Sequence, residues 1–483
     1  MPAKRPNILL ITTDRQRFDA LHMAGNPIIQ TPNLDHWGTS GVSFSRAYST
    51  TPSCIPARRT LLTGQHAATH GMPWYEDCVP FHPQFTMPQL LGQSGYQTQL
   101  IGKFHMYPPG VRHGFDHIIL SDQLDFRPQS PHFGRNDYAR WVRSQGPWSH
   151  EWANDPGAAG LSSNGRLARP FQLPEALHHT NWCVQQALDF VLERRDPTCP
   201  WFLHLSFWAP HPPLVPPAAY FDRYSGRSDL EATIGDWAPK PDVPPVGVRS
   251  DDRVGPYDPA EISTGIAGYY ATINHIDDQL GLLMSRLSDA GTRRSEEPLV
   301  VIFTSDHGEM LGDHQLWGLA LPYEASARIP MLVTARNFDL EPSRRDEMVC
   351  WEDLAPTILD LAEVEHPSPM DGRSLLPALQ GRGPAGHEVI YGEHGRGTAP
   401  AHFVIRGTDK YIWFDSGEEQ MFDLAADPLE QHDLSGDEDA MEPFRALLEA
   451  RLQGRSDYTF DRSALRPLRN RQPSFFGRRR ATF

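Results

Sequence analysis

Lysine is scarce in this chain of 483 residues, which contains only four, and no apolar run approaches the length of a membrane-spanning helix. The formal charge is −16, with 60 acidic residues against 44 lysines and arginines, and this argues against a general nucleic-acid-binding protein. The apolar run at residues 8–11 is too short for the core of a signal peptide. We therefore expect a cytoplasmic protein with no nucleic-acid or membrane partner.

Cysteine is also sparse: the five cysteines are an odd number and widely spaced, which favours neither a disulfide framework nor a zinc site. Cys54 lies just before a predicted helix, because Pro56 suits a first helical turn and Gly64 suits a helix end. The helix dipole favours an anion in that place, so Cys54 is a candidate nucleophile or metal ligand. The alternative is a half-buried structural cysteine.

Short apolar runs at residues 7–13, 96–101, 201–207 and 299–304 alternate with helical spacing at 32–40, 87–93, 175–195 and 262–287. This alternation predicts an α/β fold with a doubly wound, mostly parallel sheet flanked by helices. Each run is followed by polar residues, namely Asp14, Lys103 with His105, His211, and Asp306 with His307. Open α/β sheets bind ligands at the carboxyl ends of their strands, so we expect these side chains to form one site.

The pattern changes after residue 386, where short strands at 388–391, 401–406, 410–414 and 420–423 precede a helix at 441–452. We predict a catalytic domain at 1–385 with insertions at about 122–174 and 213–259, and a small antiparallel sheet with a helix at 386–461. The tail at 462–483 has seven arginines and no acid. It is either disordered or docks on a neighbouring subunit of a homo-oligomer, a dimer or tetramer.

Several motifs resemble those of type I, formylglycine-dependent sulfatases in the alkaline-phosphatase superfamily. They are Cys-x-Pro-x-Arg from Cys54 to Arg58, Gly-Lys-Phe-His at 102–105, Phe-Thr-Ser-Asp-His-Gly-Glu at 303–309 and Met-Phe-Asp-Leu at 421–424. The sequence contexts are most similar to choline-sulfatase-like and phosphonate-monoester-hydrolase-like members.

The resemblance implies that a formylglycine-generating enzyme oxidises Cys54, and that the aldehyde hydrate attacks the sulfate ester. It also implies that Asp14, residue 54, Asp306 and His307 hold a divalent metal. Ca²⁺ is the family default, with Mn²⁺ or Mg²⁺ as alternatives that suit carboxylates with an imidazole.

The remaining roles are also those that the resemblance implies. Asp306 is the general base for the attacking hydroxyl, and Arg58 holds the nucleophile and the charge beside the metal. Lys103 and His211 stabilise the sulfate, and one of them protonates the leaving oxygen. His105 takes the proton of the second hydroxyl, so that sulfate is expelled and the aldehyde returns.

Two positions depart from the family pattern. Arg15 stands where a second Asp is common, and Leu319 stands where a Lys is expected. We expect Arg15 to turn from the metal toward the substrate, with Gln16 and His314 as further candidates near the gap. The alternative is that Arg15 pairs with an acidic residue such as Asp19.

We conclude from the sequence that the chain is a sulfatase for small, imported sulfate monoesters, of aryl or alkyl type. A phosphonate monoester or phosphodiester hydrolase of the same superfamily is the first alternative. A non-catalytic binding protein that retains the fold is the second.

Overall fold

The computed structural model describes residues 5–122, 136–146, 161–238, 253–288, 296–395 and 400–453, together with 455, 458–461 and 464–467. Its larger sheet has nine strands: β1 (Asn7–Thr13), β2 (Val42–Tyr48), β3 (Gln97–Gly102), β4 (His117–Leu120), β5 (Trp201–Ser206), β6 (Leu299–Ser305), β7 (Arg328–Ile329), β8 (Met331–Arg336) and β9 (Ser343–Cys350). The strand order is β4-β3-β5-β1-β6-β8-β2-β7, with β9 paired to β2. The predicted mostly parallel sheet is confirmed, because β4, β3, β5, β1 and β6 run parallel and only β8 and β7 run against their neighbours.

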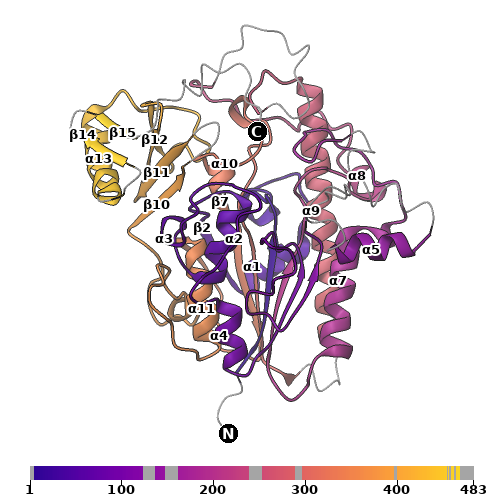
Figure 1. The fold of residues 1–483 in the computed structure, drawn as a ribbon. Helices are drawn as coiled ribbons and strands as arrows, with labels where there is room; N and C mark the ends of the chain where they lie inside the picture. The colour runs from indigo at the N-terminus through magenta and orange to yellow at the C-terminus, as the bar shows by residue number, and fades with distance from the viewer. Residues whose placement is uncertain are drawn as a thin grey trace.

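Helices cover both faces of this sheet (Figure 1). Their bounds are η1 (His22–Ala24), α1 (Pro32–Ser40), α2 (Cys54–Thr63), α3 (Ala67–His70), α4 (Met87–Gln93), α5 (Asp137–Ser144), η2 (Glu175–Leu177), α7 (His179–Asp189), η3 (Phe190–Arg194), α8 (Ala218–Phe221), α9 (Pro259–Leu287), η5 (Asp313–Gln315), α10 (Glu324–Ala327), η6 (Trp351–Asp353), α11 (Leu354–Leu361), α12 (Leu376–Leu379) and α13 (Glu438–Leu452). None of the described helices is both long enough and apolar enough to cross a membrane.

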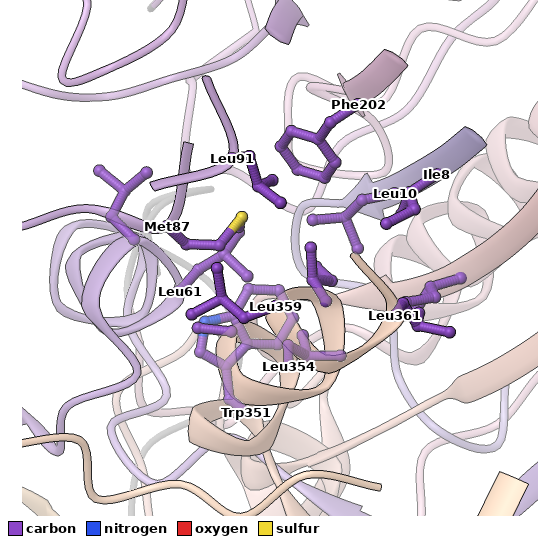
Figure 2. Close-up of a cluster of buried hydrophobic side chains, with 14 of the residues drawn as sticks. Ile8, Leu10, Leu61, Met87, Leu91, Phe202, Trp351, Leu354, Leu359 and Leu361 are labelled. Carbon is purple, nitrogen blue, oxygen red and sulfur yellow. The ribbon is translucent and has the colours of Figure 1, made fainter. Parts of the chain in front are cut away.

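The core is divided between the two faces by the alternation of side chains along β1. Ile8 and Leu10 face the cluster that α2, α4 and α11 contribute, which includes Leu61, Leu91 and Leu354 (Figure 2). Leu9 and Ile11 face the opposite cluster, which α1, α7 and α9 contribute. Both faces of β1 are buried, which is why this strand has a continuous apolar sequence.

The smaller sheet is antiparallel and has the order β10 (Val389–His394), β11 (Ala401–Arg406), β12 (Asp409–Phe414) and β13 (Glu419–Asp423). Helix α13 packs on it through Phe444 and Leu448, as the sequence predicts. A separate two-stranded sheet follows, of β14 (Tyr458–Asp461) and β15 (Ala464–Pro467). Most of the basic tail at 462–483 lies outside the described residues, and the domain boundaries stay predictions.

One lysine joins the four-stranded sheet to α10. Lys410 on β12 is fully buried and its Nζ lies 3.0 Å from Glu324 on α10 and 2.8 Å from Glu430. The backbone N–H of Glu324 donates to Glu430 at 2.7 Å. Burial raises the pKa of Glu430 to about 7 although Lys410 lowers it. Removing one member of such a buried network leaves the others without a partner, so Lys410 is structural.

The predicted insertion at 122–174 contains one helix among its described residues that the sequence did not predict. This helix, α5, buries Tyr138, Ala139 and Val142. Asn136 caps it by accepting a hydrogen bond from the Ala139 N–H at 2.9 Å. The helix was missed because its apolar face is short and lies within a sequence rich in proline, glycine and tryptophan.

Four buried histidines predict that the fold loses stability in acid. Burial lowers the pKa of His66, His179 and His204 to about 3 and that of His178 to about 4. An unfolded histidine has a pKa of about 6.5, so below that pH the unfolded chain binds protons that the folded chain does not. Each group then reduces the free energy of unfolding by about 1.4 kcal/mol per pH unit.

We therefore expect the melting temperature to be insensitive to these groups above pH 7 and to fall steeply between pH 6.5 and 5. In His204→Gln the fall should be shallower, whereas His36→Gln, at an exposed position on α1, is the matched control. A melting temperature that stays constant between pH 7.5 and 5 would contradict this expectation.

Candidate active site

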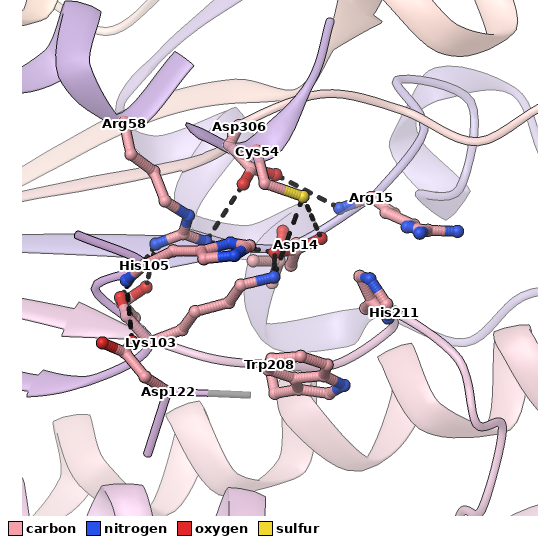
Figure 3. Close-up of polar contacts among 12 residues, drawn as sticks. Asp14, Arg15, Cys54, Arg58, Lys103, His105, Asp122, Trp208, His211 and Asp306 are labelled. Carbon is pink, nitrogen blue, oxygen red and sulfur yellow. Dashed lines mark hydrogen bonds and ion pairs between the residues drawn. The ribbon is translucent and has the colours of Figure 1, made fainter. Parts of the chain in front are cut away.

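Asp14 begins the site, at the carboxyl end of the central strand β1, and is completely buried. It accepts hydrogen bonds from Lys103 Nζ and, at 3.2 Å, from Arg58 Nη2. Burial alone would raise the pKa of Asp14, but its interactions with Lys103, His211 and Arg58 hold that pKa well below its usual range. Asp14 is therefore an anion beside several cationic groups, as Figure 3 shows.

Cys54 is the first residue of α2, after Ser53 in extended conformation at the N-cap, and Gly64 ends the helix in left-handed conformation. Its Sγ lies 3.3 Å from His307 Nε2, 3.8 Å from Asp14 Oδ1 and 3.8 Å from Lys103 Nζ. The predicted placement at a helix N-terminus is thus observed, and the helix aims the side chain at the end of β1.

Asp306 and His307 follow β6, the neighbour of β1. Asp14, Cys54, Asp306 and His307 are all buried, and each offers one ligand atom within 4.8 Å of the others. Burial, and then the charge of Asp14, raise the pKa of Asp306. Burial lowers the pKa of His307, but the carboxylate of Asp306 and the sulfur of Cys54 raise it to about 9. Two adjacent buried carboxylates need a positive charge between them, and this donor set fits a divalent cation.

Arg58, one turn into α2, ties these elements together. Its Nη1 donates to the Lys103 carbonyl at 2.8 Å and to Ser206 Oγ at 2.9 Å. Its Nη2 lies 3.0 Å from Asp306 Oδ2. Burial lowers the pKa of Arg58, but Asp306 and Asp14 more than offset this, so the guanidinium stays charged. One side chain therefore fixes the ends of β1, β3, β5 and β6.

Lys103 is fully buried at the end of β3, and its Nζ lies 4.1 Å from the ring centroid of Trp208. The indole supports the ammonium group by a cation–π contact and limits where it can move. Trp208 was not singled out in the sequence, since an aromatic residue in a Pro-rich loop gives no signal of this contact.

The two other predicted histidines lie at the same edge of the sheet. His211 packs on Trp208, with 4.6 Å between ring centroids, and its Nδ1 donates to the Pro212 carbonyl at 2.6 Å. His105 is buried, and its backbone N–H donates to Asp122 at 2.7 Å. Burial lowers the pKa of both rings well below 6.5, with Arg15 and Lys103 adding to the effect at His211 and Lys103 at His105. Both imidazoles are neutral bases.

The predicted alternative for Arg15, a pair with an acidic residue, is observed, but the partner is Glu309 and not Asp19. Asp19 pairs with Arg17 at 2.7 Å, while Arg15 Nη1 lies 3.0 Å from Glu309 Oε2. Glu309 is 294 positions away in the chain but follows β6 directly, so the fold brings it to the end of β1. Arg15 has left-handed backbone, with φ of 68°, which turns its side chain away from the Cys54 sulfur (Figure 3).

His314 lies apart from these contacts. Its Nδ1 accepts the Gly235 N–H at 3.0 Å, and its ring stacks 4.6 Å from that of Trp237. Its described partners are therefore not those of Asp14 or Cys54. Gln16 is fully buried beside the site, and among the described residues neither polar atom of its side chain has a hydrogen-bond partner.

A second group of possible ligands, Cys350, Asp353 and His387, serves the local fold. Asp353 accepts the N–H groups of Cys350 and Arg373 at 2.8 and 2.7 Å and also bonds His387 at 3.0 Å. Burial raises the pKa of the Cys350 thiol well above its usual value, which opposes metal binding by a thiolate. The carboxylate of Asp353 is already satisfied by backbone donors.

The sheet, its small antiparallel companion and the buried cluster at the carboxyl ends of β1, β3, β5 and β6 define a hydrolase of the alkaline-phosphatase superfamily. A model of the sulfatase family matches residues 6–364, and a model of the C-terminal part of N-sulphoglucosamine sulphohydrolase matches residues 312–457. The chain belongs to the sulfatase family, whose members hydrolyse sulfuric esters.

Relatives cover almost the whole chain. An arylsulfatase of Clostridium perfringens is 37% identical over 94% of this chain and 95% of its own. A choline-sulfatase of Rhizobium meliloti is 27% identical over 90% of this chain and 83% of its own. The crystal structure of a phosphonate monoester hydrolase of Agrobacterium radiobacter superimposes with a TM-score of 0.74, 22% identity, and coverage of 96% of this chain and all of that one. The last comparison shows the shared fold.

Proposed function

We propose that this sulfatase is a cytoplasmic enzyme that cleaves small aryl or alkyl sulfate monoesters through a formylglycine at position 54. The observation that carries the proposal is the Cys54 side chain, which the N-terminus of α2 holds within 4 Å of His307, Asp14 and Lys103. An aldehyde hydrate at this place has one hydroxyl for attack and a second for release of the product, which no serine offers.

Asp14, Asp306, His307 and residue 54 are the proposed metal ligands. Their buried oxygen and nitrogen donors suit Ca²⁺, with Mn²⁺ or Mg²⁺ as alternatives. When bound, the cation polarises the sulfuryl oxygens and lowers the pKa of the attacking hydroxyl.

Three side chains act on the protons and the charge of the reacting groups. Asp306 accepts the proton of the attacking hydroxyl as its oxygen bonds to sulfur and the S–O bond to the alcohol breaks. Arg58 holds Asp14 and Asp306 in position and offsets their charge. His105, neutral at pH 7, then accepts the proton of the second hydroxyl, and sulfate leaves with restoration of the aldehyde.

The sequence leaves open whether Lys103 or His211 protonates the leaving oxygen, and the geometry favours Lys103. The His211 Nδ1–H is engaged by the Pro212 carbonyl, and because the ring is neutral its Nε2 carries no proton. Lys103 is an ammonium paired with Asp14, so it has a proton to give. His211 is cationic only if the negative charge of the bound sulfate ester raises its pKa.

The alternative function is phosphonate monoester or phosphodiester hydrolysis, which the likeness to the Agrobacterium hydrolase supports at the level of fold. The Gly-Lys-Phe-His motif that supplies Lys103 and His105 favours the sulfatase. An intact set of buried catalytic side chains argues against the non-catalytic binding protein. A panel of sulfate, phosphate and phosphonate monoesters with the same 4-nitrophenyl or phenyl group separates these functions. The highest kcat/KM on the sulfate supports the proposal, and a higher value on the phosphonate ester replaces it with the alternative.

A homo-oligomer, dimer or tetramer, remains a proposal that rests on the arginine-rich tail and the acidic body. Truncation after Asp461 is expected to lower the oligomeric mass in light scattering at low salt. High salt should weaken the intact oligomer in the same way, because the contact is electrostatic. An unchanged mass for the truncated chain would reject this role of the tail.

A further inference from the structure

Arg15 is almost completely buried, with 2% of its surface exposed, and lies next to the catalytic cluster without joining it. Its Nη2 donates to Asn164 Oδ1 at 2.6 Å and its Nη1 to Glu309 at 3.0 Å. Its Nε, by contrast, has no hydrogen-bond partner among the described residues. A buried guanidinium N–H without a partner costs free energy that an additional acceptor recovers.

A second arginine, Arg253, reaches the same region from the other Pro-rich insertion. Its Nη1 donates to the Leu319 carbonyl at 3.0 Å, and its own carbonyl accepts the Trp317 N–H at 2.9 Å. The next residue of that segment, Ala320, donates to the carbonyl of Pro52 at 2.9 Å, two positions before Cys54. The guanidinium of Arg253 therefore binds the backbone at Leu319, the residue that stands where the sequence lacks the expected lysine.

Both arginines lie beside the contact between Glu309 and Gly318: Arg15 pairs with Glu309, and the guanidinium of Arg253 lies against Gly318. Burial and then the charge of Arg15 lower the pKa of Arg253 to about 10, while Glu309 and Cys54 act in the opposite direction. Glu309 is already engaged: its Oε2 accepts from Arg15, and its Oε1 accepts from the backbone N–H of Gly318. Two guanidinium groups that repel one another around an occupied carboxylate form a place that favours a further anion.

The positively charged side chains extend away from the catalytic cluster on one side. His211 has its pKa lowered by burial, then by Arg15 and by Lys103, so it lies within the field of both cations. In Figure 3 His211 and Arg15 lie on the same side of the Asp14 cluster, beyond the end of Lys103. Positive charge thus continues outward from the group that faces the scissile sulfate. A substrate bound along this line places its alcohol part near Arg15.

We propose that Arg15 and Arg253 form a second anion subsite, which binds a carboxylate on the alcohol part of the sulfate ester. This inference rests on the proposed sulfatase function and narrows its substrate class to sulfate esters that carry a second negative group. A guanidinium presents a planar fork that matches a carboxylate.

The test compares 4-(sulfooxy)phenylacetate with its uncharged amide, and the 3-substituted pair alongside, since both members of a pair have similar leaving groups. For the wild type we expect kcat/KM for the carboxylate to exceed that for the amide by about tenfold or more in at least one pair, mainly through KM. Arg253→Gln is expected to remove most of this preference, and Arg253→Lys to retain part of it. Arg382→Gln, at an exposed ion pair far along the chain, is the matched control and should keep the full preference.

The possible outcomes distinguish a failure of the proposed subsite from a failure of the proposed sulfatase function. Turnover of 4-nitrophenyl sulfate without preference for either carboxylate overturns the subsite alone. An equal loss on carboxylate and amide in Arg253→Gln also overturns it, because Arg253 would then only hold the segment at Leu319. Absence of turnover on every sulfate by formylglycine-containing protein overturns the proposed function, and the subsite with it.

Discussion

Cys54→Ala is expected to lower kcat for sulfate ester hydrolysis by about 10³-fold or more, because alanine cannot be oxidised to the formylglycine that we propose as the nucleophile. The fold should survive, since the side chain is small and makes only weak contacts through sulfur. The melting temperature of the variant is therefore the control for folding.

Cys54→Ser tests separately the attack on sulfur and the release of the sulfuryl group. A serine hydroxyl can attack sulfur but has no second hydroxyl to expel the sulfuryl group, so the variant should react once and stop. Intact-protein mass spectrometry after incubation with substrate is expected to show one added sulfuryl group on Cys54→Ser and none on Cys54→Ala. Steady turnover by either variant near the wild-type rate would show that residue 54 is not the nucleophile.

Asp306→Asn is expected to have the second large effect, the loss of both the metal and about 10³-fold in kcat/KM. The amide keeps the shape of the side chain but removes one of the two buried negative charges that face the cation, and it cannot accept the proton of the attacking hydroxyl. Asp14→Asn should lose metal for the same electrostatic reason.

Two measurements beside activity check this prediction. Elemental analysis after gel filtration should find about one divalent ion per chain in the wild type and far less in Asp306→Asn. Added Ca²⁺ should raise the melting temperature of the metal-stripped wild type but not that of the variant, since only the former binds it in the folded state. Asp346→Asn, whose side chain is 78% exposed, is the matched control. An Asp306→Asn protein that keeps metal and a near-native rate would remove Asp306 from the ligand set.

The strands that the sequence predicted are those that are buried along nearly their whole length. β1, β3, β5 and β6 are buried on nearly every position, so each appears as a short apolar run that ends in polar residues. β2 and β9 were missed because neither has a continuous apolar sequence. Polar residues alternate with apolar ones in β2, and β9 begins with polar residues that include the arginine pair at 344–345.

The candidate site was predictable because the carboxyl ends of parallel strands lie at the same edge of the sheet. Asp14, Cys54, Lys103 and Asp306 converge as that rule requires. The partners of Arg15 and Lys103 were not predictable, because Glu309 and Trp208 approach through space from residues far along the chain. Arg253 was missed for the same reason: nothing in a Pro-rich loop indicates that one arginine binds the backbone at Leu319.

The most direct test of the formylglycine mechanism is mass spectrometry of the peptide that contains residue 54, made on the same preparations in which sulfate release is measured. Preparations produced with and without a formylglycine-generating enzyme should differ in the fraction of Cys54 in which oxygen replaces sulfur. The account predicts that sulfate release rises in proportion to that fraction and vanishes when it is zero. Full activity in a preparation whose Cys54 is entirely an unmodified thiol would contradict it.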